Sequence, residues 1–163
     1  MRRLADRILG SDNPSGVVYG VIVIGALLAA ESSLHETYTE TFASAALAAA
    51  VYWLAHSYSS VLGRRLAGEE RLTPAALLRA LAHDGAVVRG AAIPLLALLL
   101  CRLVGAEQRT AVDVAVWSAA ASLVLFELLA ALRSRLAPTE AAFEVAVGIA
   151  MAMAILGLKI LLH

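Results

Sequence analysis

Residues 141–162 read AAFEVAVGIAMAMAILGLKILL, a run of 22 residues in which only Glu144 and Lys159 carry a formal charge. A helix needs about 20 mainly apolar residues to cross the hydrocarbon core of a bilayer, which is about 30 Å thick. Further apolar stretches approach that length at residues 16–30, 41–62, 86–104 and 111–132. Open strands cannot satisfy their backbone groups in lipid, and none of the stretches alternates as barrel strands do. The pattern therefore predicts an all-α bundle of five transmembrane helices.

The composition places this bundle in a lipid bilayer. Hydrophobic residues make up 61% of the 163 residues and charged residues 16%, whereas soluble domains have about 45–50% and about 25%. The formal net charge is zero, so the chain lacks the basic field of a nucleic-acid-binding protein. The single cysteine, Cys101, excludes a disulfide framework and any multi-cysteine metal or cluster site. We expect one membrane domain over residues 1–163, with no cofactor and no metal.

The distribution of basic residues predicts the orientation of the spans. Nine arginines flank the spans on one side: Arg2, Arg3, Arg7, Arg64, Arg65, Arg71, Arg79, Arg133 and Arg135. Only Arg102, Arg109 and Lys159 lie on the other side. We therefore expect a multi-pass inner-membrane protein with a cytoplasmic N-terminus and an external C-terminus. Between spans 2 and 3, the segment Leu72–His83 begins at a capping Thr73-Pro74 pair and resembles a short helix at the cytoplasmic interface.

A shift of 70 residues pairs residues 16–67 with residues 86–137 without a gap. The identities include Val17 with Val87 and Gly20 with Gly90. Each unit reads as an interfacial segment, a span, a short external loop and a second span, so the chain is predicted to contain a parallel repeat with residues 141–162 as an added helix. The alternative is a coincidence of membrane composition. Gly16 with Gly20, and Ala86 with Gly90, also favour close helix contact or self-association.

Four costly polar side chains are predicted to lie at one depth in the cytoplasmic half of the bundle. They are His56 in span 2, Arg89 in span 3, Glu127 in span 4 and Glu144 in span 5. Ionisable groups within a span usually face a partner or a water-filled cavity. Such a layer could relay protons or coordinate a cation. In the alternative, Arg89 and Glu144 extend to the interface while Glu127 pairs with Arg89 to fix helix packing.

On the opposite side, the acidic residues Glu31, Glu36, Glu40 and Asp113 could form an outer vestibule that concentrates cations. A solvated loop that obeys the orientation rule is the simpler interpretation. The zinc helix, the phosphate-binding glycine loop and the nucleophile elbow are missing from the sequence, so we expect no enzyme.

Two passages carry a resemblance to a known family. Residues 15–18, SGVV, lead through Ile24 and Leu28 to Glu31, and Tyr52-Trp53 is followed shortly by His56. These residues resemble the first two spans of the bacterial relatives of the lysosomal potassium channel, whose first span opens with Phe-Ser-Asp-Gly. The likeness covers about the first 60 residues. This chain lacks the Phe and Asp of that motif. Members of the family have six spans, whereas five are expected here. It implies a homo-oligomer whose first helices line a pore, with Ile24 and Leu28 at the constriction.

The sequence therefore predicts passage of a monovalent cation or a proton through a membrane protein that forms homo-oligomers in the lipid bilayer. The alternative is a non-catalytic subunit or assembly factor that binds another membrane protein through its small-residue faces.

Overall fold

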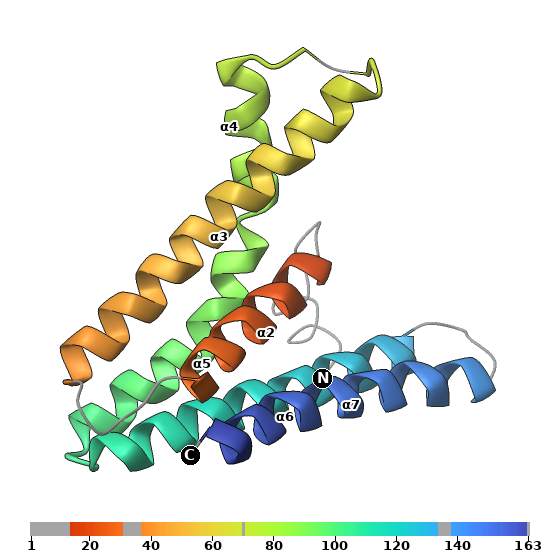
Figure 1. The fold of residues 1–163 in the computed structure, drawn as a ribbon. Helices are drawn as coiled ribbons and strands as arrows, with labels where there is room; N and C mark the ends of the chain where they lie inside the picture. The colour runs from red at the N-terminus through yellow and green to blue at the C-terminus, as the bar shows by residue number, and fades with distance from the viewer. Residues whose placement is uncertain (1–13, 31–36, 70, 134–137, 163) are drawn as a thin grey trace.

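The computed structural model describes residues 14–30, 37–69, 71–133 and 138–162, and these ranges contain six α-helices and no β-strand. In chain order they are α2 (Pro14–Ala30), α3 (Tyr38–Leu66), α4 (Pro74–His83), α5 (Ala86–Leu103), α6 (Gln108–Arg133) and α7 (Pro138–Leu162) (Figure 1). The all-α class expected from the sequence is confirmed.

Three of the helices are long and apolar enough to cross a membrane, at Ala86–Leu103, Gln108–Ala131 and Thr139–Leu162. This is fewer than the five spans expected from the sequence. The apolar helix α2 has 17 residues and extends only about 25 Å. The 29 residues of α3 extend about 43 Å, but the stretch from Tyr52 to Ser60 contains a histidine and three serines, which make α3 less apolar. The three long helices support a membrane protein.

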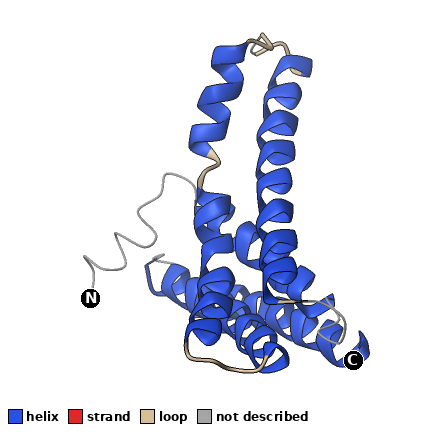
Figure 2. Ribbon diagram, turned by 90° about the vertical axis from the view of Figure 1, so that its left-hand side faces the viewer, coloured by secondary structure: helices blue, strands red, loops and turns tan. Residues whose placement is uncertain are grey.

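The hydrophobic core is built around α2. Its side chains Val21, Ile24 and Leu28 have 0% exposure and pack in one cluster with buried residues of α5, α6 and α7. Helix α2 contacts all three of these helices and also α3. Figure 2 shows the α3–α4 hairpin extending away from the remaining helices. This short helix is therefore held mainly by its protein neighbours.

Helices α2 and α5 cross at two glycines. A Cβ atom on Gly20 would lie 2.0 Å from the carbonyl oxygen of Val87, and one on Gly90 would lie 1.9 Å from the carbonyl oxygen of Val17. Both distances are far below van der Waals contact, so only glycine allows the two backbones to approach this closely. The small-residue spacing thus serves a contact within the chain.

The contact between α2 and α5 is symmetric, because residues 70 positions apart make the same contact from each helix. Gly20 and Gly90 are 70 positions apart, as are Val17 and Val87, and each glycine faces the valine of the other helix. The same shift relates buried Leu28 to buried Leu98. Equivalent positions of α2 and α5 therefore meet each other at their interface.

At one end of the molecule, α3 is joined to the turn between α5 and α6. The hydroxyl group of Tyr38 donates to the carbonyl oxygen of Ala106, and the Arg102 guanidinium lies 5.1 Å above the centre of the Tyr38 ring. Nearby, Nε2 of Gln108 donates to Oγ1 of Thr41 over 3.1 Å. From this junction α3 and the α6–α7 pair diverge (Figure 1).

At the far end of α3, the chain returns through α4. The side chain of Thr73 accepts a hydrogen bond from the backbone N–H of Ala76 at 3.1 Å and caps α4. Buried Ala76 and Ala80 pack on Val61 of α3. This helix matches the expected segment Leu72–His83, and only Asp84 and Gly85 separate it from α5.

Candidate functional site

The contact between α6 and α7 brings Glu127 and Glu144 together. Glu144 lies one helical turn before Gly148 on α7, and a Cβ atom on Gly148 would lie 2.4 Å from Cγ of Glu127. The side chain of Glu127 therefore occupies the space that a residue larger than glycine would fill. Because residues one turn apart share a face of a helix, Glu144 lies on the face of α7 that meets Glu127. A pair of like charges is thus built into the packing of these two helices.

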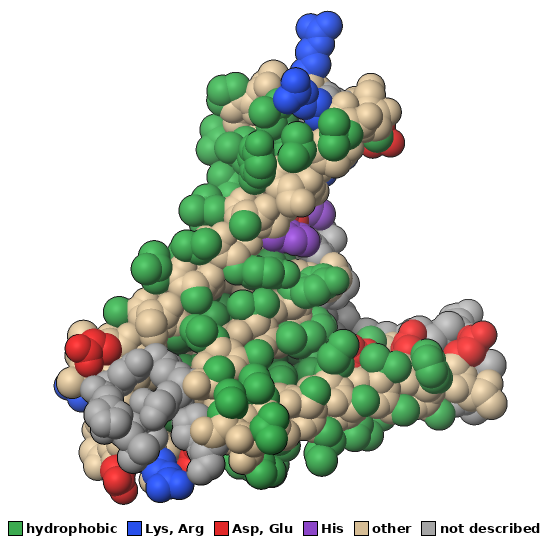
Figure 3. Space-filling model, viewed as in Figure 1, with side chains coloured by type: hydrophobic (Ala, Val, Ile, Leu, Met, Phe, Trp, Pro, Cys, Tyr) green, Lys and Arg blue, Asp and Glu red, His purple; other side chains and the backbone are tan. Residues whose placement is uncertain are grey.

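Both glutamates lie inside their helices rather than at the ends. Glu127 precedes the last residue of α6, Arg133, by six positions, and Glu144 follows the first residue of α7, Pro138, by six. Six residues correspond to about 9 Å along a helix. Both residues are partly buried, and Oε2 of Glu144 is buried without a hydrogen-bond partner. Figure 3 shows acidic side chains along the diverging end of the α6–α7 pair.

Among the residues whose side chains the structure describes, which exclude 132–138, no basic side chain is paired with Glu127 or Glu144. The ion pair found there joins Nζ of Lys159 on α7 to Oδ1 of Asp113 on α6 over 3.4 Å. Asp113 is 14 positions before Glu127, about 21 Å along α6. The α6–α7 pair therefore carries compensated charge near one end and two adjacent carboxylates near the other.

His56 belongs to a different group of side chains. Its ring lies 6.0 Å from the ring of Tyr52, nearly parallel to it, and 6.0 Å from the ring of Tyr19 on α2. Helix α3 meets α6 near Thr41, and His56 lies 15 positions further along α3, about 22 Å away. No described contact joins His56 to Glu127 or Glu144, and the ring contacts of His56 are with Tyr52 and Tyr19.

Arg89 is exposed on α5, and no hydrogen bond or ion pair of its side chain is found in the described part of the chain. Of the four residues expected to form one polar layer, the structure brings Glu127 and Glu144 together and leaves His56 and Arg89 apart from them. The expected Arg89–Glu127 packing pair is likewise absent from the described contacts.

Ile24 and Leu28, the residues expected to line a pore between copies, both have 0% exposure in a single chain. They pack against α5, α6 and α7 in the core. A pore shared by the first helices of several copies would need these side chains on the surface of each copy, and this fold places them inside.

The acidic residues expected to form an outer vestibule have separate roles in the structure or lie outside its described part. Asp113 is paired with Lys159, and Glu40 completes a capping box at the start of α3. Glu31 and Glu36 lie outside the described residues. The two described acids therefore have structural partners of their own.

The capping box makes the start of α3 sensitive to acid. Oε2 of Glu40 accepts hydrogen bonds from the backbone N–H of Thr37 at 2.7 Å and from its hydroxyl group at 2.9 Å. The backbone hydrogen bond first, and then the hydroxyl, hold the pKa of Glu40 below its ordinary value. A lowered pKa contributes stability above the ordinary glutamate pKa, about 4.3, and that stability is lost as the pH falls through the lowered value.

We therefore expect amides in the first turn of α3 to lose protection against hydrogen exchange, relative to the intrinsic rate at the same pH, below about pH 4. Thr37→Ala removes the hydroxyl group but keeps the backbone N–H, so the pKa of Glu40 should rise part of the way toward its ordinary value and this acid sensitivity should diminish. The first turn of α4 is the control, because Thr73 caps it without a glutamate in the third position, which is Ala76. An unchanged Glu40 pKa in Thr37→Ala, measured by NMR titration, would contradict this account of the cap.

Comparisons with known proteins identify no relative. A scan against models of protein families, a search of curated proteins and a search of solved structures each return no match. The described residues contain no group of three or more His, Cys, Asp or Glu side chains that could hold a metal ion. The resemblance to relatives of the lysosomal potassium channel stays a prediction from the first two spans.

Proposed function

We propose that this chain is an inner-membrane protein that mediates passage of a proton or a monovalent cation, and that Glu127 and Glu144 bind the ion. The observation that carries the proposal is that Glu127 covers Gly148 on α7, one turn from Glu144, with no basic partner among the side chains that the structure describes, a set that excludes residues 132–138. An ionised side chain near the centre of a bilayer costs about 2.5–3.5 kcal/mol. Two adjacent carboxylates add mutual repulsion, and one bound proton or cation relieves both costs.

The position of the pair favours a pathway within one chain. Ile24 and Leu28 are enclosed by their own helices, so they give no support to a pore between copies. The carboxylates instead lie near the last turns of α6 and the first turns of α7, the end of the pair away from the junction with α3. In the topology that we propose, this end faces the cytoplasm, because Arg64, Arg65, Arg71 and Arg79 lie in the hairpin.

We propose that α2 and α3 complete the five spans. The position of α2 suits a short helix in a membrane, because neighbouring helices rather than lipid cover the buried residues between its two ends. The reciprocal crossing at Gly20 and Gly90 also supports our proposal that α2–α3 and α5–α6 are duplicated hairpins, with α7 added. In this arrangement Glu127 comes from the second hairpin and Glu144 from the added helix.

Flux measurements in liposomes test the proposed function. The full-length wild-type chain should dissipate an imposed pH gradient or a potassium gradient faster than protein-free liposomes. A potassium ionophore with equal potassium on both sides clamps the membrane potential and removes any potassium gradient, so a pH gradient that still dissipates faster than in protein-free liposomes identifies the proton as the permeating ion. Folded protein that dissipates neither gradient would exclude the proposal. Stoichiometric purification with a different membrane protein would then favour a non-catalytic subunit.

A further inference from the structure

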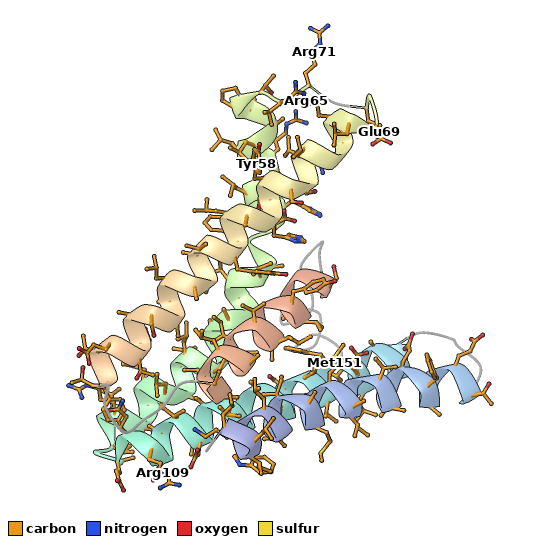
Figure 4. All side chains as sticks on the ribbon, in the orientation of Figure 1. Tyr58, Arg65, Glu69, Arg71, Arg109 and Met151 are labelled. Atoms are coloured by element: carbon orange, nitrogen blue, oxygen red, sulfur yellow. The ribbon has the colours of Figure 1, made fainter. Side chains whose placement is uncertain are left out.

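The end of the α3–α4 hairpin carries a basic surface that the proposed ion passage does not use. One hollow of about 630 Å³ is lined by Arg65, Gly68, Glu69, Arg71 and Leu72. A neighbouring hollow of about 320 Å³ has Arg64, Arg79, His83 and Asp84 among its lining residues. The two hollows thus have four arginines in their linings together with the carboxylates of Glu69 and Asp84, and the sequence adds Glu70 between Glu69 and Arg71, so arginine exceeds carboxylate by one. Figure 4 shows Arg71 pointing away from the helices, with Arg65 and Glu69 at the same end.

Large apolar side chains are exposed beside these arginines. Leu66, Leu72 and Leu78 have exposed fractions of 79%, 41% and 66%. On the opposite side of α4, Ala76 and Ala80 are buried against α3. The hairpin end therefore presents leucine and arginine together, which is typical of a surface that lies among lipid headgroups and the adjoining acyl chains.

The chain connectivity keeps this surface near a bilayer. Only two residues, Asp84 and Gly85, separate α4 from α5, a helix long and apolar enough to span. Helix α3 extends about 43 Å, longer than the hydrocarbon core of about 30 Å, so its last turns with Arg64 and Arg65 reach the headgroup level when the helix spans.

We infer that the hairpin end binds anionic phospholipid headgroups of the adjacent leaflet. The guanidinium groups of Arg65 and Arg71 would donate to the phosphodiester oxygens, with the exposed leucines among the upper acyl chains. Anionic headgroups are favoured over zwitterionic ones because their charge complements the excess of arginine over carboxylate. The inference does not depend on ion passage.

Competition between lipids tests the inference on the full chain. The protein in detergent receives equal amounts of phosphatidylglycerol and phosphatidylcholine, and native mass spectrometry gives the ratio of the two retained lipids. We expect wild type to retain phosphatidylglycerol preferentially, Arg71→Gln to lower the ratio about fivefold, and R65Q/R71Q to bring it close to one. Arg71→Lys keeps the charge and should retain most of the preference. Arg109→Gln is the matched control, because Arg109 is exposed near the opposite end (Figure 4).

Three results would overturn the inference. The first is equal retention of both lipids by wild type. The second is an equal decrease of the lipid ratio in Arg109→Gln and Arg71→Gln. The third is displacement of the lipid by millimolar inorganic phosphate, which would indicate a site for a soluble anion. Thermal unfolding of each variant identifies folded protein. Should R65Q/R71Q not fold, the comparison of Arg71→Gln with Arg109→Gln decides, because both residues are exposed and both variants lose one charge.

Discussion

Substituting alanine for Gly20 or Gly90 should lower the free energy of unfolding by about 3 kcal/mol, near the upper end of what overpacking costs. The added methyl carbon would lie 2.0 Å from the carbonyl oxygen of Val87 or 1.9 Å from that of Val17, and both obstacles are backbone atoms. A side chain could rotate away, but a helix backbone must move as a unit. The α2–α5 crossing would therefore open, and with it the core around α2.

The same substitution elsewhere in the chain provides the control. A Cβ atom on Gly157 of α7 or Gly63 of α3 would meet nothing within 4 Å. Alanine in those helices should be neutral or stabilising by about 0.5–1 kcal/mol. The midpoint of thermal unfolding in detergent, followed by circular dichroism, compares all four variants. Unfolding midpoints of Gly20→Ala and Gly90→Ala equal to that of Gly157→Ala would show that the crossing is not a close contact in solution.

The helices themselves could largely be predicted from local composition. The expected span 86–104 corresponds to Ala86–Leu103, and the expected span 141–162 lies within Pro138–Leu162. Long apolar runs have few alternatives to helix in lipid. The short helix after Thr73 was predictable for another reason, because the threonine side chain caps the first turn and proline suits the first helical position.

The number of spanning helices was harder to predict, because the length of an apolar stretch does not show whether protein or lipid surrounds the helix. Helix α2 is short and still occupies the centre of the core. Helix α3 is the longest, yet Tyr52, His56 and Ser57 interrupt its apolar surface and Tyr19 lies beside His56. No local signal in the sequence indicates that Tyr19 of α2 meets His56 of α3.

The sequence predicts how deep each candidate residue lies in the membrane, but not the helix face on which it lies. Counting residues along each span places His56, Arg89, Glu127 and Glu144 at similar heights, and only the two glutamates are neighbours. Height along a helix says nothing about the face on which a residue lies or about the tilt of that helix. His56 lies against the rings of Tyr52 and Tyr19, and Arg89 is on the exposed face of α5. Gly148 was also missed, although its spacing of one turn from Glu144 places both on one face of α7.

Glu127→Gln and Glu144→Gln should each reduce ion flux in liposomes by roughly 100-fold, if the carboxylate pair supplies the binding energy of the permeating ion. Removing the compensation for one charge in the bilayer costs about 2.5–3.5 kcal/mol, which corresponds to about two powers of ten in rate. The amide is nearly isosteric, so it can still fill the space above Gly148. Because glutamine also removes the repulsion within the pair, the free energy of unfolding should stay the same or increase.

A fall in flux without a fall in the free energy of unfolding distinguishes an ion-binding role of the glutamates from a packing role. If the glutamates only fixed helix packing, their substitution would lower stability and flux together or leave both unchanged. Glu107→Gln is the matched control, since Glu107 is exposed just before α6 and its loss should leave flux unaltered. Gly148→Ala gives an independent test, because the new methyl group would lie 2.4 Å from Cγ of Glu127 and must displace that carboxylate without changing any charge. Flux should then fall although both glutamates are present, whereas wild-type flux in Glu127→Gln and Glu144→Gln would remove the pair from the pathway.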